Sequence, residues 1–380
     1  MKKQRALLAL VSTFSAPLWA HPLDDASIWM YDGARLGAKT PPAMVTQSAT
    51  TAQPATDAPS GAPATFFMTV FPENGERRDA PDAPAQSAAD AEEGANPKGQ
   101  RHAWTAALGY RRERLDFNIA GPGGTPNVLS ELKWETEMAE FRLNGDWMAA
   151  NGFTVAGELA YASGFSGKVR DSDYVYSGRR GEFSRSYSKP HGSTESRATL
   201  GLGWRIMPHS RIGVTPMAGY AYQEQDLRSR HGRQVVSDFG FGVPLGPIHG
   251  LDSHYRPRWH GPWLGLRLDA HLGKRFDLRF GLKQQWYRYR AEADWNLRSN
   301  FEHPVSFRHH GSSSGWQAEI GALWHLSAQS AITFTLDRSE QRLRNGTDRT
   351  FFSSGESTKT RLNGVNWDSW AGALGWRLDF

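Results

Sequence analysis

Alternation of apolar and polar residues is the sequence feature that most constrains the fold of this 380-residue chain. In an extended strand, successive side chains point to opposite faces, so residues two apart share a face. At the C-terminal end, one face then holds the large apolar residues Trp370, Leu374, Trp376, Leu378 and Phe380. The opposite face holds small or charged residues, among them Arg377 and Asp379. The pattern recurs over residues 141–147, 264–272, 276–283 and 316–326, and it predicts an all-β chain.

Charged residues recur on one face of nearly every predicted strand. In a soluble β-protein the apolar face would form the core, whereas in a transmembrane barrel it faces lipid and the polar face lines the lumen. Aromatic residues near the strand ends favour the membrane barrel. No apolar run approaches the roughly 20 residues that a membrane helix requires, which excludes a helical membrane protein. The terminal stretch from Trp376 to Phe380 is typical of barrels in the bacterial outer membrane.

The pattern predicts ten strands, an even number, as closed antiparallel barrels of this membrane have. They cover residues 104–119, 128–148, 153–166, 193–207, 210–229, 255–272, 276–297, 312–327, 330–345 and 360–380. Alternate connections are short, and the others, which include residues 167–192, 230–254 and 298–311, are long and polar. We therefore expect a ten-stranded antiparallel transmembrane β-barrel with its long loops outside the cell and a narrow, side-chain-filled lumen.

The N-terminal hundred residues differ from the rest in composition. Residues 1–20 combine a basic start, an apolar run and a small residue at Ala20, which predicts a secretory signal peptide. Nine Pro and fourteen Ala lie among small polar and acidic residues between 41 and 100. Such a segment buries too little apolar surface to fold. The sequence thus predicts three parts: a signal peptide (1–20), a Pro/Ala-rich and largely disordered segment (21–102) and a barrel (103–380).

Composition narrows the classes of function. Cysteine is absent, which excludes disulfide frameworks and cysteine nucleophiles. Residues 101–380 hold 36 Lys and Arg against 28 Asp and Glu, but no basic block, so a nucleic-acid partner is not expected. This surplus suits an anionic lipid surface. The pairs His249 and His254, and His309 and His310, lack a diagnostic spacing, so no metal site is predicted.

Two groups of residues have the chemistry for catalysis. Asp171 and Asp173 share one face of an extended segment, where like charges raise the pKa of one carboxyl and let the pair work as a base. His303 lies near acidic residues in the stretch 293–304, and a carboxylate partner would fix its tautomer. The alternatives are a solvated acidic loop paired with nearby arginines such as Arg170, and a surface histidine without a function.

Several short motifs, taken in order, resemble the omptins, a family of ten-stranded outer-membrane aspartyl-type proteases. They are Leu129–Trp134, Asp171–Tyr174, Met217–Tyr220, Glu302–His303 and Asn363–Trp367. The resemblance covers residues 103–380 and implies that Asp171 and Asp173 form the catalytic acid pair. It also implies that His303 faces this pair across a water. Phe301 stands where the omptins have the acid that orients the histidine, and either Asp294 or Glu302 could substitute for it.

The resemblance further implies that bound lipopolysaccharide is required and that no covalent cofactor is needed. We therefore predict a monomeric omptin-like endopeptidase that hydrolyses exposed polypeptides with Asp171, Asp173 and His303. The alternative is a catalytically inactive barrel of this type, acting as an adhesin, a lipid-binding structural protein or a narrow porin, and Phe301 favours it.

Overall fold

The computed structural model describes residues 100–206, 211–240 and 244–380. The predicted signal peptide and almost all of the predicted Pro/Ala-rich segment lie outside these residues. Within the described ranges, no helix is long and apolar enough to cross a membrane.

Eleven strands and one short 3-10 helix are present in the described part of the chain. They are β1 (Arg101–Ile119), η1 (Pro122–Gly124), β2 (Ser130–Met148), β3 (Phe153–Tyr176), β4 (Arg180–Lys189), β5 (Thr194–Trp204), β6 (Ile212–Ser237), β7 (Gly246–His271), β8 (Phe276–Asp294), β9 (Phe307–His325), β10 (Ser330–Phe351) and β11 (Ser357–Asp379).

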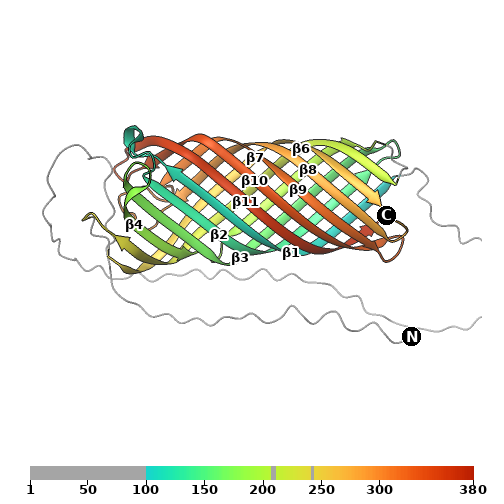
Figure 1. Cartoon of the computed structure of the whole chain (residues 1–380), viewed down its shortest axis with the longest axis horizontal. Coiled ribbons are helices and arrows are strands. Elements are labelled where there is room, and N and C mark those ends of the chain that lie inside the picture. Colours follow the sequence, from blue (N-terminus) through green and yellow to red (C-terminus); the bar gives the residue numbers. More distant parts are fainter. Residues whose placement is uncertain (1–99, 207–210, 241–243) are drawn as a thin grey trace, which may run out of the picture. The chain divides into compact units, whose positions relative to one another are not determined.

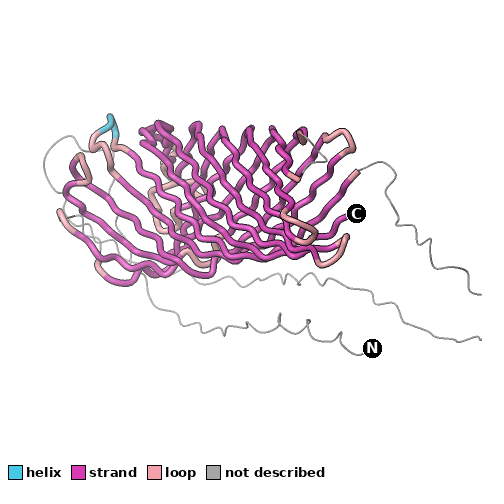
Figure 2. Tube along the Cα trace, turned by 45° about the vertical axis from the view of Figure 1, so that its right-hand side comes forward, coloured by secondary structure: helices cyan, strands magenta, loops and turns pink. Residues whose placement is uncertain are grey.

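These strands form one closed antiparallel ring (Figure 1, Figure 2). Strand β1 pairs with both β2 and β11, which closes the barrel. Strands β4 and β5 share a single position, because both pair with β3 on one side and with β6 on the other. Pro190, which has no N–H to donate to a ladder, lies in the break between them. The ring thus has ten positions, and the predicted ten-stranded all-β barrel is confirmed.

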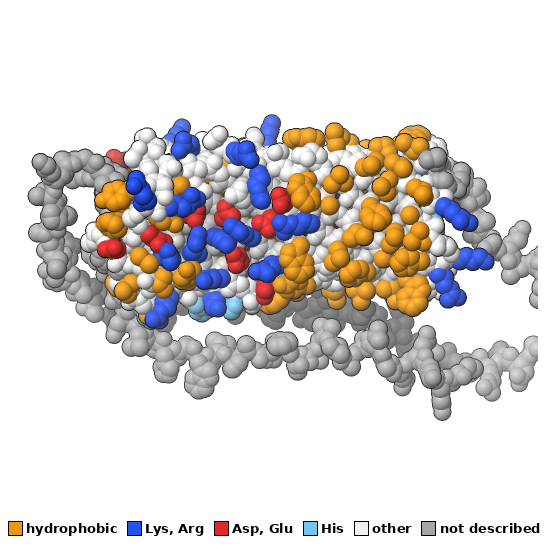
Figure 3. Space-filling view, viewed as in Figure 1, with side chains coloured by type: hydrophobic (Ala, Val, Ile, Leu, Met, Phe, Trp, Pro, Cys, Tyr) orange, Lys and Arg blue, Asp and Glu red, His pale blue; other side chains and the backbone are white. Residues whose placement is uncertain are grey.

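Large apolar side chains cover the outside of the barrel over the half that holds the C-terminus (Figure 3). We call this surface the apolar belt. Tryptophans such as Trp104, Trp204 and Trp376, each about half exposed, lie along its edge near the chain end. At the opposite edge, the Tyr110 ring lies 5.3 Å from that of Trp370. Within the belt, apolar residues therefore face outward and polar residues inward, as a membrane barrel requires.

The strands continue well past the apolar belt, toward what we call the distal end, the end away from Phe380 (Figure 1). The prediction that residues 167–192 and 230–254 form long polar loops was wrong. Both segments consist mostly of paired strand, in β3 with β4 and in β6 with β7. The pattern failed there because beyond the belt the outward positions are polar too, while main-chain pairing needs no apolar face.

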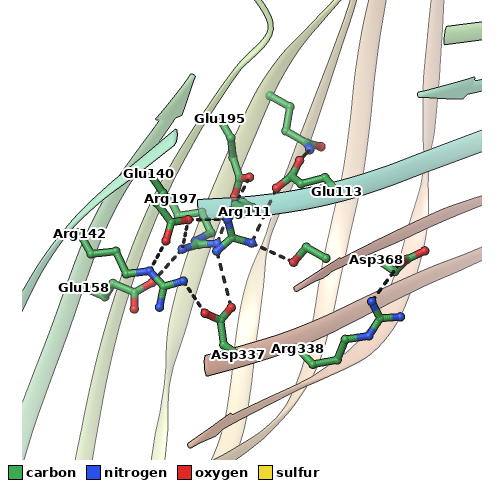
Figure 4. A network of polar contacts seen from close by, with 12 residues as sticks. Arg111, Glu113, Glu140, Arg142, Glu158, Glu195, Arg197, Asp337, Arg338 and Asp368 are labelled. Carbon is green, nitrogen blue, oxygen red and sulfur yellow. Dashed lines mark hydrogen bonds and ion pairs between the residues drawn. The ribbon is translucent and has the colours of Figure 1, made fainter. Parts of the chain in front are cut away.

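Side chains fill the lumen in layers, and the layer nearest the C-terminus holds Asp146 with Arg267 and Arg279. Near the distal edge of the belt, Arg111 is fully buried and contacts Glu140 and Asp337 (Figure 4). Toward the distal end follows an aromatic core, in which Trp134 stacks on Tyr255 at 5.4 Å between ring centroids. This core lies between the Arg111 layer and the distal end, and it packs against the strands that carry the distal end.

Candidate functional site

A β-bulge in β3 turns the two aspartates toward the inside of the barrel. Phe165 has no partner on β2, because Ser166 pairs with Glu137 and Gly164 with Met138. The extra residue exchanges the two faces of the strand. Phe165 faces outward and is 54% exposed, whereas Val169, four residues later, is buried inside. Asp171 and Asp173 share the face of Val169, and we call them the acid pair.

The acid pair lies beyond the apolar belt in a desolvated setting. Burial and the charge of Asp173 raise the pKa of Asp171 well above its usual range, and Arg298 opposes this rise. Burial also raises the pKa of Asp173, against the effect of Arg298 and of hydrogen bonds from Ser130 and Ser184. Two carboxyls this close titrate as one unit, so the first proton leaves more easily than the second.

The loop from residue 295 to residue 306, between β8 and β9, carries His303. The Nδ1 atom of His303 lies 2.6 Å from Oδ1 of Asp294, the last residue of β8. A carboxylate in this position keeps the proton on Nδ1 and leaves Nε2 for other partners. Of the two acids that the sequence offered as partners of the histidine, Asp294 is thus the one that contacts His303.

Arg298 connects the histidine to the acid pair. Its charge acts on both Asp171 and Asp173, and its main-chain oxygen lies 3.3 Å from Nε2 of His303. Burial lowers the pKa of Arg298 to about 10, against the effect of the two aspartates. Arg298 and Asp171 line one cavity of about 60 Å³, together with polar side chains such as Ser184 and apolar ones such as Ile248 and Leu251.

Phe301 has a structural role in this loop. Its ring lies 5.9 Å from that of Phe352, and the two residues form a β-bridge that ties the loop to the turn after β10. The guanidinium carbon of Arg298 lies 5.2 Å from the centre of the Phe301 ring, within the range of a cation–π interaction. The residue at which this chain departs from the omptin pattern therefore positions Arg298.

The structure places Asp171 and Asp173 on β3 and His303 on the exposed surface of the β8–β9 loop. Of these three residues, Asp171 alone lines the cavity beside Arg298, which we call the distal cleft. Sequence reasoning missed Arg298, although it lies in the same stretch as His303. The sequence indicates Arg298 only as a basic residue within the stretch 293–304, which contains His303. Among the described residues, no group of three or more His, Asp or Glu side chains is arranged to hold a metal ion.

Comparison with known proteins identifies the family. Residues 105–379 match the model of a family described as Pom, Protochlamydia outer membrane protein. A search of curated proteins finds no match. The outer membrane protease OmpT from Escherichia coli is similar in structure, with a TM-score of 0.64 and 12% sequence identity over 74% of this chain and 97% of that chain.

The likeness to OmpT shows the fold alone, because the identity is so low. The outer membrane protein OprG from Pseudomonas aeruginosa also matches, at 12% identity over 74% of this chain and 97% of its own. Its TM-score of 0.27 is too low to indicate a shared fold. Three findings indicate a location in the outer membrane, namely the closed barrel, its outward-facing apolar belt and the family match. The chain belongs to the Pom family and is an integral β-barrel protein of the bacterial outer membrane.

Proposed function

We propose that the barrel is an endopeptidase that hydrolyses exposed polypeptides at its distal end. The observation that carries this proposal is the 2.6 Å contact between Asp294 and His303, which supplies the orienting acid that Phe301 cannot provide. Asp171 and Asp173, with one proton between them, act as the base toward a water. His303, with Nδ1 held by Asp294, orients this water through Nε2 once Nε2 turns away from the main-chain oxygen of Arg298, which lies 3.3 Å from it.

The proposal is tested by cleavage of a fluorogenic peptide library by the full-length protein with added lipopolysaccharide. Asp171→Asn and His303→Ala should each lower kcat by about 10² to 10⁴, the usual contribution of an acid or base group. Matched controls are Asp368→Ala and His310→Ala, because both side chains lie on outward-facing positions away from the cleft. A folded wild-type protein that cleaves no peptide, or variants as active as wild type, would contradict the proposal.

Lipopolysaccharide is the lipid partner that we propose, with the protein acting as a monomer. Its acyl chains suit the apolar belt, and its phosphates suit basic residues just beyond the belt. Arg258 pairs in register with Arg290, and His260 with Arg288, on adjacent strands β7 and β8. Omitting lipopolysaccharide from the cleavage assay should therefore lower activity, and equal activity without it would exclude this requirement.

A second candidate is a closed barrel without catalysis, acting as an adhesin or a lipid-binding structural protein. Arg298 favours it, since a cation next to the acid pair weakens the pair as a base. A narrow porin is the least supported alternative, because the buried ion pairs around Arg111 and the aromatic core cross the lumen. Absence of cleavage together with a folded barrel would favour this second candidate.

A further inference from the structure

Two buried polar atoms in the distal cleft have no hydrogen-bond partner in the part of the chain that the structure describes. They are Oδ1 of Asp171 and Nε of Arg298. Both residues line the cavity of about 60 Å³, which has room for a few water molecules or the tip of a ligand. A buried polar atom without a partner costs about 1–3 kcal/mol, so these atoms call for a ligand that satisfies them.

The unpartnered atoms define the chemistry of this ligand. The carboxylate oxygen of Asp171 accepts a hydrogen bond, whereas the N–H of Arg298 can only donate one. The ligand must therefore bring a donor to the β3 side and an acceptor to the loop side. A water together with a peptide carbonyl meets both requirements, with the water against Asp171 and the carbonyl oxygen against Arg298.

We propose that Arg298 binds the carbonyl oxygen of the scissile peptide bond and stabilises the negative charge that develops on it. This inference rests on the proposed endopeptidase function and adds a residue to its site. Phe301, under the guanidinium, is a positioning residue that holds Arg298 in place. The loop that carries both is anchored, because Glu302 donates its N–H to the oxygen of Phe351 and Ser306 donates its own to Ala293.

The reaction then balances with groups of this cleft alone. The water oxygen adds to the carbonyl carbon, and the electron pair of the C=O bond moves to the oxygen at Arg298. The water proton passes to the acid pair. When the C–N bond breaks, the pair returns this proton to the leaving nitrogen, and the charge on the oxygen collapses to give the carboxylic acid. Arg298 remains protonated throughout.

The test compares Arg298→Met with Arg308→Met in the full-length protein. Arg308 is a matched control, because it also lies over an aromatic ring, that of Phe351 at 5.4 Å, but is exposed on the outer surface. Arg298→Met should lower kcat by about 10² to 10³, as does removal of one oxyanion donor, with KM nearly unchanged. Arg298→Lys should recover part of the loss, and Phe301→Leu should lower kcat by about 2- to 5-fold.

A second measurement does not depend on turnover. A peptide with a phosphinate in place of the scissile bond carries a tetrahedral anionic group like that of the intermediate. Arg298→Met should weaken its binding at least 10-fold, and Arg308→Met should leave it unchanged. Faster cleavage by Arg298→Met, or phosphinate binding equal to wild type, would overturn the inference. Wild-type protein that cleaves no peptide would instead reject the proposed function, so the two failures are distinguishable.

Discussion

Arg111 should be essential for the stability of the closed lumen. Its side chain is fully buried, bonds Glu140 and the hydroxyl of Ser369 at 2.8 Å, and lies 3.6 Å from Asp337. Arg111→Met removes these contacts and takes one positive charge out of a buried cluster, in which Arg142 remains the partner of Glu140 and Asp337. Breaking a buried pair in this way costs about 3–5 kcal/mol. For a barrel of this size, that corresponds to a decrease in Tm of roughly 6–20 °C.

Thermal unfolding of the full-length protein in micelles measures this effect, with the heat-modifiable gel mobility of folded barrels as a second probe. The matched control is Arg338→Met. Arg338 also pairs with a carboxylate, Asp368 at 3.1 Å, but its side chain is 41% exposed, so the loss should be about 0–1 kcal/mol. Equal Tm values for Arg111→Met and Arg338→Met would refute the reasoning, because burial would then make no difference.

Two further predictions concern the distal cleft. Asp294→Asn should lower the proposed peptidase activity by about 10² or more, because His303 loses the acid that fixes its tautomer; peptide cleavage checks this, and unchanged kcat would contradict it. Asp171→Asn should raise Tm at pH 8 and leave it nearly unchanged at pH 4. The pKa of Asp171 is raised by burial, so the folded state binds more protons than the unfolded chain and loses stability as the pH rises above about 4. Equal Tm shifts at both pH values would exclude this explanation.

The sequence predicted those parts of the fold that depend on local alternation. Leu374 and Trp376 differ from Arg377 in polarity, and this difference, together with the aromatic residues at the strand ends, indicates which face meets lipid. Beyond the belt, the outward Arg170 and the inward Asp171 are both charged, so alternation disappears although the strand continues. The bulge at Phe165 was equally hidden, since the shift depends on pairing with β2.

The candidate site shows the same limit. The acid pair follows from spacing, because residues two apart share a strand face. The role of Arg298 depends on contacts with β3, more than 100 residues earlier in the chain, and on the ring of Phe301. From the sequence, Phe301 indicated only the loss of an acid. In the structure it supports a cation, and Asp294, at the end of β8, contacts the histidine instead.

The extension of the strands past the apolar belt also determines what the cleft can reach. Asp171 follows Phe165 by six residues, about 20 Å along a strand. At a tilt of about 40°, this places the acid pair about 15 Å farther from the hydrocarbon than the belt edge. Paired strands, rather than a mobile loop, hold the acid pair at this distance from the belt. A polypeptide substrate of the proposed peptidase would therefore meet the cleft in water, and segments embedded in the bilayer would stay out of its reach.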